Sequence, residues 1–125
     1  LFMLVSITGS RGLSVSFSDI EAHLPPDTTA IVSGGAAGVD SVAADFARSR
    51  GITLSVIRPV YTGSLPRTAP LERNSAIVTE AEYCLIFWDG RSPGTKDTLS
   101  KAVKAGKHGK VVIIGSCVLD SVIRF

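Results

Sequence analysis

Short runs of apolar residues that do not alternate with polar ones constrain the fold of this chain most strongly. Two of them, Phe2–Thr8 and Tyr83–Trp88, are mostly apolar along their whole length. A strand with one face in water alternates apolar and polar residues, whereas a strand inside a parallel sheet is covered on both faces. The runs therefore predict buried strands of a parallel sheet.

Helical patterns separate these runs. In the clearest of them, Val39–Arg50, apolar residues recur every three or four positions, and Gly51 stands where a helix cap is expected. The predicted strands are Phe2–Thr8, Ala30–Ser33, Thr53–Ile57, Tyr83–Trp88 and Lys110–Ile114. The predicted helices are Ser18–Leu24, Val39–Arg50, Pro70–Ala81 and Thr95–Ala105. The remaining segment, Ser116–Phe125, fits either a short helix or a sixth strand.

Alternation of strands and helices predicts an α/β fold with right-handed crossovers. We expect a three-layer sandwich around a mostly parallel, Rossmann-like sheet of five strands in the order 3-2-1-4-5. Within it, Ser18 and Glu21 have the spacing of a capping box, and Asp97 and Lys101 have the spacing of an ion pair along a helix. Val103 is expected on the buried face of its helix.

Length and composition exclude several classes of protein. With 125 residues, 45% of them hydrophobic, the chain is expected to form one globular domain over 1–125 rather than a disordered segment. No apolar run approaches the roughly 20 residues of a membrane span. The net charge of +2 is too small to indicate a polyanionic partner. Since no secretory signal is evident, we expect a cytoplasmic protein.

The cysteines and histidines do not have the spacing of a metal site. Cys84 and Cys117 lie in apolar runs and are expected to be reduced, buried thiols. His23 and His108 are expected on a helix surface and in a turn. The sequence therefore predicts neither a metal nor a cofactor.

Glycine, small hydroxyl side chains and arginine are concentrated after the carboxyl ends of the first four predicted strands. These loops contain Gly9–Arg11, Gly34–Asp40, Tyr61–Asn74 and Asp89–Thr95. Ligands of open α/β sheets bind at this edge, where the strand order changes direction. The connections at the opposite edge look like plain turns, and this asymmetry indicates a ligand site.

Two of these loops lead into helices whose first turns are suited to bind an anion. Gly34, Gly35 and Gly38 would let a phosphate or ribose approach the backbone, although the same glycines also suit a plain tight turn. Asp40 is an acceptor for a ligand hydroxyl or simply an acidic residue of a first helical turn. Gly94 and Thr95 form the second start, where Thr95 is equally suited to cap the helix.

The Arg73 guanidinium can form two parallel hydrogen bonds with a phosphate or carboxylate, and the Asn74 side chain can form hydrogen bonds with an amide-like edge of a ligand. Arg11 adds a cation to the same loops. Either arginine could instead be a solvated surface residue. Tyr61 and Trp88 could stack on a base, but the apolar run before Trp88 favours partial burial in the core.

Together these motifs resemble the SLOG superfamily, Rossmann-like domains related to the Smf/DprA DNA-processing proteins and the LOG hydrolases. The resemblance rests on Ile7–Arg11, Val32–Asp40, Glu72–Asn74 and Gly90–Thr95. It implies binding of a nucleotide or nucleotide-derived ligand. The residues implied to bind it are Gly9, Ser10, Arg11, Gly34, Gly35, Asp40, Arg73, Asn74, Gly94 and Thr95. Gly38, which belongs to the glycine-rich start of a helix, completes the set of eleven predicted binding residues.

Two residues depart from the family's pattern, and these departures rank the functional hypotheses. Thr98 stands where LOG enzymes carry a glutamate, and this counts against nucleotide hydrolysis. If the chain does hydrolyse a nucleotide, the candidate acids and bases are Glu72, Asp89 and Asp40. Ala37 stands where related sequences often carry arginine, which counts against single-stranded DNA binding. A sensor or carrier that binds a nucleotide-like small molecule is therefore the first hypothesis. A homodimer formed through the segment Val122–Phe125 is also expected.

Overall fold

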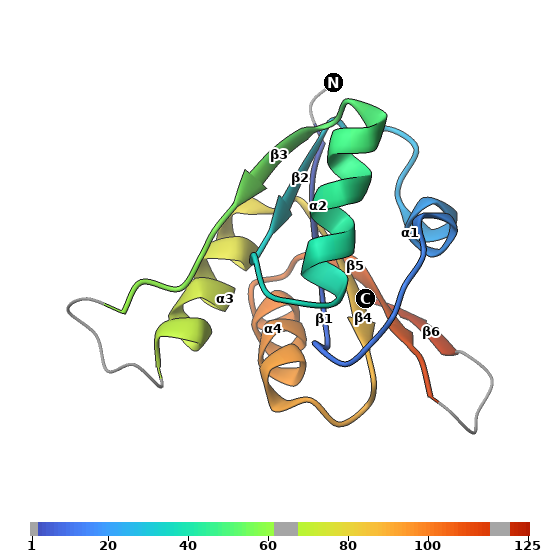
Figure 1. The fold of residues 1–125 in the computed structure, drawn as a ribbon. Coiled ribbons are helices and arrows are strands. Elements are labelled where there is room, and N and C mark those ends of the chain that lie inside the picture. Colours follow the sequence, from blue (N-terminus) through green and yellow to red (C-terminus); the bar gives the residue numbers. More distant parts are fainter. Residues whose placement is uncertain (1–2, 62–67, 116–120) are drawn as a thin grey trace.

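The computed structural model describes residues 3–61, 68–115 and 121–125. These residues form a six-stranded sheet flanked by four helices (Figure 1). The strands are β1 (Leu4–Gly9), β2 (Ala30–Ser33), β3 (Thr53–Val56), β4 (Tyr83–Trp88), β5 (His108–Ile113) and β6 (Ser121–Arg124). The helices are α1 (Phe17–His23), α2 (Val39–Arg50), α3 (Ala69–Glu80) and α4 (Pro93–Lys104).

The order of the strands is β3-β2-β1-β4-β5-β6, which confirms the predicted order of the first five. These five are parallel, and β6 pairs antiparallel with β5 at the edge. The chain builds outward from β1 to β3 and then returns to place β4 on the other side of β1. The switch in direction between β1 and β4 opens a crevice at the carboxyl ends of these two strands.

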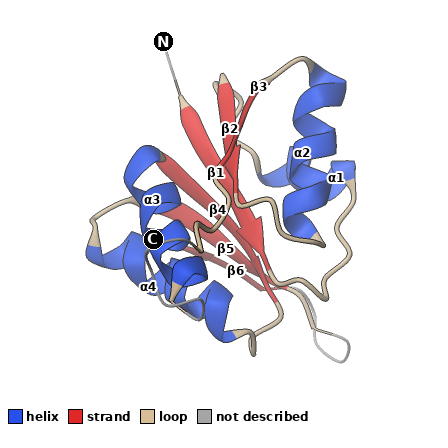
Figure 2. Cartoon of the chain, turned by 60° about the vertical axis from the view of Figure 1, so that its left-hand side comes forward, coloured by secondary structure: helices blue, strands red, loops and turns tan. Residues whose placement is uncertain are grey.

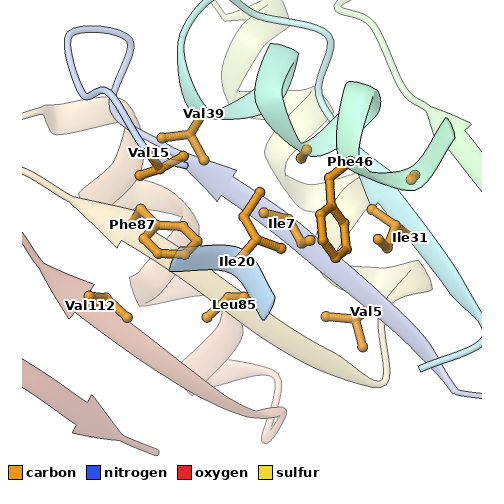
Figure 3. Close-up of a cluster of buried hydrophobic side chains, with 12 residues drawn as sticks. Val5, Ile7, Val15, Ile20, Ile31, Val39, Phe46, Leu85, Phe87 and Val112 are labelled. Atoms are coloured by element: carbon orange, nitrogen blue, oxygen red, sulfur yellow. The ribbon is translucent and has the colours of Figure 1, made fainter. Parts of the chain in front are cut away.

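The helices cover both faces of the sheet. Helices α1 and α2 lie on one face and α3 and α4 on the other (Figure 2), so the predicted three layers are present. On the first face, Ile20 from α1 and Phe46 from α2 pack over Val5, Ile7 and residues of neighbouring strands (Figure 3). The second core consists of Val32, Ile77, Val78, Ala81, Cys84, Ile86, Ala102 and Val111. Strand β4 contributes residues to both cores, which explains why its run does not alternate. Strand β1 contributes Val5 and Ile7 to the first core, and its partly buried Leu4 packs against the second.

The start of α1 differs from the prediction. The capping box consists of Ser16 and Asp19, because the Ser16 hydroxyl accepts from the Asp19 N–H and the Asp19 carboxylate accepts from the Ser16 N–H. The predicted pair, Ser18 and Glu21, lies inside the helix. Phe17 packs edge-on against Phe46, with ring centroids 5.5 Å apart, so the first helical residue is fixed by its contact with α2.

The boundaries of α4 and β5 also differ from the prediction. Helix α4 begins at Pro93 after the cap residue Ser92, so Thr95 is its third residue and not its cap. Val103 is 55% exposed, and the expectation that it faces the core is wrong. Strand β5 begins at His108, a residue expected in a turn, because His108 pairs with Tyr83 of β4.

The tail contributes the sixth strand, one of the two structures that the sequence left open. The Cys84 thiol is free and buried, and burial raises its pKa, as expected of an unreactive structural cysteine. Cys117 lies outside the described residues.

Candidate functional site

A cavity of about 300 Å³ opens at the carboxyl ends of the central strands. The end of β1, the loop after it, the start of α2, and helices α3 and α4 all contribute to its lining. Eight of the eleven residues predicted to bind a ligand line it: Gly9, Ser10, Arg11, Asp40, Arg73, Asn74, Gly94 and Thr95. Lining residues up to 90 positions apart in the sequence, Thr8 and Thr98, thus meet where the strand order changes direction.

Asp40 is the buried carboxyl group of the cavity, with only 4% of the residue exposed. Its Oδ2 atom accepts a hydrogen bond of 3.1 Å from the Ala36 N–H. Its Oδ1 atom has no hydrogen-bond partner among the described residues. Burial raises the pKa of Asp40 to about 6, although the Ala36 N–H and the nearby Arg73 and Arg11 guanidinium groups act in the opposite direction.

Arg73 lies beside Asp40, on the first half of α3. Its Nη1 group donates to the Gly34 carbonyl over 2.6 Å, and its Nε group donates to Asn74 Oδ1 over 3.2 Å. Burial lowers the pKa of this guanidinium, and Asp40 opposes that shift. An arginine remains charged in proteins even so. These contacts hold a cation at the cavity in one orientation.

Asn74 connects α3 to α4. Its Nδ2 group donates to the Gly94 carbonyl over 3.2 Å and to Asp97 Oδ2 over 3.1 Å. Asp97 in turn forms the predicted ion pair with Lys101, with Nζ and Oδ2 2.8 Å apart. Because its amide group already has these partners, Asn74 positions the start of α4 at the cavity.

Hydroxyl groups line the inner part of the site. Ser10 Oγ and Thr95 Oγ1 lie 3.3 Å apart and are both buried, and Ser10 Oγ also accepts from the Asp89 N–H. Thr98 Oγ1 donates to the Gly94 carbonyl. Thr8 Oγ1 is buried and has no partner within the part of the chain that the structure describes.

Sequence reasoning missed Thr8 as a residue of the site. It stands in the apolar run of β1, where it was interpreted only as part of a strand. A signal was nevertheless present, because a hydroxyl side chain at the carboxyl end of a central strand points to the ligand edge of an α/β sheet.

The three glycines before α2 do not line the cavity. A Cβ atom at Gly34 would lie 2.6 Å from Arg73 Nη1 and 2.8 Å from Asp40 Oδ2, so the bare backbone there makes room for those side chains. Gly38 has a φ of 79° and lies against the Arg11 carbonyl, which only glycine tolerates easily. Gly35 lies beside Arg58, whose Nη1 group donates to its carbonyl.

Gly12 and Gly94 differ from those glycines. Both line the cavity, neither has a positive φ, and a Cβ atom added to either would meet nothing within 4 Å. The protein's own packing therefore gives no reason for glycine at these two positions.

Two of the three carboxylates suggested for acid–base chemistry, Glu72 and Asp89, lie outside the cavity lining. Glu72 is exposed on α3. Asp89 accepts from the Ser92 and Arg91 N–H groups, both over 2.8 Å, and these bonds lower its pKa to about 2. Asp89 thus organises the loop before α4, and Asp40 is the carboxyl group that faces the cavity.

The aromatic candidates lie in different surroundings. Trp88 is partly buried, as expected, and its Nε1 group donates to the Ser92 carbonyl over 3.1 Å. Tyr61 is 54% exposed and interacts electrostatically with Arg73, which places it toward the same side of the molecule as the cavity.

A search of the described residues finds no group of three or more histidine, cysteine, aspartate or glutamate side chains that could hold a metal ion. Across the same residues, no helix is both long enough and apolar enough to cross a membrane.

Comparison with solved structures identifies a similar fold. The crystal structure of DNA processing protein A (DprA) from Streptococcus pneumoniae superposes with a TM-score of 0.74 at 22% sequence identity, over 94% of this chain. The fold is similar to that of DprA. At this level of identity the likeness concerns the fold alone. The chain spans about half the length of that protein, 52%. No family model and no curated protein matches the sequence.

Proposed function

We propose that the cavity binds a nucleotide or a nucleotide-derived small ligand. The observation that carries this proposal is the pairing of two unpartnered buried polar atoms, Thr8 Oγ1 and Asp40 Oδ1, with two arginines around one cavity. Buried polar groups are nearly always hydrogen-bonded, so unpartnered atoms on side chains that line a cavity favour a ligand that supplies the partners. A volume of about 300 Å³ is at the lower end of ligand sites and suits one small molecule.

The phosphate of this ligand is assigned to the start of α4. The first N–H groups of a helix attract anions, and Gly94 leaves the approach to them open. Arg11 is exposed at the cavity and has no hydrogen bond or ion pair with the other described residues, so its guanidinium is free to meet a phosphate. Arg73 supplies a second positive charge that its own hydrogen bonds hold in place.

Binding is favoured over hydrolysis by the position of the carboxylates. Glu72 and Asp89 lie outside the cavity lining, and Thr98, which lines it, occupies the position of the glutamate found in LOG enzymes. Asp40 remains a candidate base for a hydrolase, which is the alternative function.

Single-stranded DNA is the second alternative ligand. It is favoured by one observation, the similarity of the fold to that of a protein described as a DNA processing protein. The near-neutral composition does not favour it, because DNA binding by neutralisation of several phosphates needs a surplus of basic residues.

A thermal-shift screen over nucleoside mono-, di- and cyclic phosphates tests the proposal. We expect stabilisation by at least one of them, since a ligand that binds only the native state raises the midpoint of unfolding. Arg11→Ala is expected to weaken binding about tenfold, because a hydrogen bond to a charged group contributes about 1.5–3 kcal/mol. Arg48→Ala, at an exposed arginine of α2 outside the cavity lining, is the matched control.

Two outcomes would contradict the proposal. Absence of a shift with every nucleotide would overturn it. Binding of oligonucleotides alone, with a steep dependence on salt, would favour single-stranded DNA instead.

A further inference from the structure

We propose that Thr8 and Asp40 bind the ribose hydroxyl groups of the ligand, so that the cavity selects ribonucleotides over deoxyribonucleotides. The inference rests on the proposed function and specifies which part of the ligand lies deepest. It is argued from the two cavity side chains whose polar atoms lack protein partners.

The group that meets Asp40 must be a neutral hydrogen-bond donor. An ionised carboxylate only accepts hydrogen bonds, and the Oδ1 atom of this 4%-exposed residue has no donor within the described part of the protein. A phosphate would be repelled there, and the nearby Arg73 and Arg11 disfavour a cation. Within a nucleotide, this leaves the ribose hydroxyls and the amino groups of the base.

Thr8 favours the ribose hydroxyls. Its hydroxyl, in a residue 7% exposed, needs an acceptor for its own proton. Each ribose hydroxyl both accepts and donates in every ribonucleotide, whereas a base supplies this pair only where an amino group lies beside an accepting ring nitrogen. Two neighbouring hydroxyls can therefore accept from Thr8 and donate to Asp40 at once. Sugar phosphates without a base separate the two groups in the test.

The rest of the cavity agrees with this orientation. The phosphate is assigned to the start of α4, and the ribose is the part of a nucleotide directly attached to it. Pro70 and Leu71 provide apolar lining, and Leu71 is 41% exposed, so a base can lie against them toward the solvent.

Matched pairs of ligands test the inference. Binding constants are measured by calorimetry for the four common ribonucleoside 5′-monophosphates, their 2′-deoxy counterparts and 3′-deoxyadenosine monophosphate. Ribose 5-phosphate and 2-deoxyribose 5-phosphate form a pair without a base. We expect the ribo form to bind at least about tenfold more tightly, because a missing hydroxyl leaves a buried polar group unpaired.

Substitutions assign the selectivity to the two residues. Thr8→Val keeps the shape of the side chain and removes the hydroxyl, and Asp40→Asn keeps the shape and removes the charge. Each is expected to bring the ribo-to-deoxyribo ratio toward one. Thr8→Ser, which retains a hydroxyl, is expected to preserve the ratio.

The matched controls are Thr79→Val on α3 and Asp45→Asn on α2, both exposed residues outside the cavity lining. Both are expected to preserve the ratio. Thermal unfolding of each ligand-free variant verifies that it is folded before binding is measured.

The outcomes separate this inference from the proposed function. Equal binding of ribo and deoxyribo forms by the natural sequence overturns the inference and leaves nucleotide binding intact. A ratio that survives both Thr8→Val and Asp40→Asn overturns the role of these residues. Failure of every compound to bind overturns the proposed function and the inference together.

Discussion

Asp40 makes stability depend on pH in a direction opposite to that of most carboxylates in proteins. Burial raises its pKa from 3.8 to about 6, so the native state holds this proton more tightly than the unfolded chain. Between these two values, stability falls as pH rises, and above pH 6 the ionised group opposes folding by about 3 kcal/mol. A ligand that donates to Oδ1 would offset part of this cost.

Asp40→Asn is expected to remove this dependence. Urea unfolding between pH 4 and pH 7.5 should show the variant gaining stability relative to the natural sequence as pH rises through about 5, by up to about 3 kcal/mol. The difference between the two curves isolates this group from the other titrating residues. Asp45→Asn, exposed on the same helix, is the control, and a constant difference between the Asp40→Asn and natural curves would contradict the prediction.

At the scale of the elements, two positions that look alike in the sequence hold glycine for different physical reasons. A Cβ atom at Gly9, at the end of β1, would lie 2.5 Å from the Phe87 carbonyl oxygen and 2.7 Å from Val39 Cγ2. One at Gly94, in the first turn of α4, would lie in open space within the cavity. The first glycine lets α2 pack on the sheet, and the second leaves room at the end of the cavity where we propose that the phosphate binds.

Substitution by alanine should separate these roles. Gly9→Ala is expected to destabilise the protein by about 1–3 kcal/mol, because the methyl group overpacks against backbone. Gly94→Ala is expected to leave stability unchanged or raise it by up to about 1 kcal/mol while weakening nucleotide binding. Denaturant unfolding and calorimetry provide the two measurements, and a Gly94→Ala variant that binds normally would contradict the assignment of the phosphate.

The contact between α3 and α4 depends on side chains that reach from one helix to the other. Asn74 reaches both Gly94 and Asp97, and Lys101 Nζ donates to the Leu71 carbonyl over 2.6 Å. The i,i+4 spacing predicts the pair between Asp97 and Lys101, but no local pattern predicts that Asn74 joins it from another helix.

On the scale of the whole molecule, the free edge of the sheet is a candidate interface. Strand β6 is the last in the order, and its Val122 and Ile123 are 40% and 52% exposed. An unprotected apolar edge strand readily pairs with another strand. A second copy in antiparallel pairing centred between these residues would place Ser121 opposite Arg124, with no like charges facing each other.

We therefore expect a homodimer formed through β6. Light scattering at micromolar concentration should give twice the mass of one chain, and Ile123→Lys should give a single chain. Val103→Lys, at an exposed apolar residue of α4, is the control that should remain dimeric. A monomeric natural protein at this concentration would overturn the expectation.

The sequence alone determined the layers and the order of the sheet. The run around Ile86 is apolar on both faces and that around Ile7 is buried on both, and a parallel sheet with helices on either side buries both faces. Chain connectivity and the handedness of crossovers then leave few strand orders. The ligand edge followed, because Gly9, Asp40, Arg73 and Gly94 all come after the carboxyl ends of strands.

Only the tertiary structure decided what these residues do at that edge. Gly34 makes room for Arg73, Asn74 positions α4, Asp89 organises a loop, and Thr8 joins the cavity from inside a strand. Each of these roles depends on partners that lie far away in the sequence. Local spacing reports which side chains share an element, but which polar atoms find partners and which stay open to a ligand is settled when separate elements pack together.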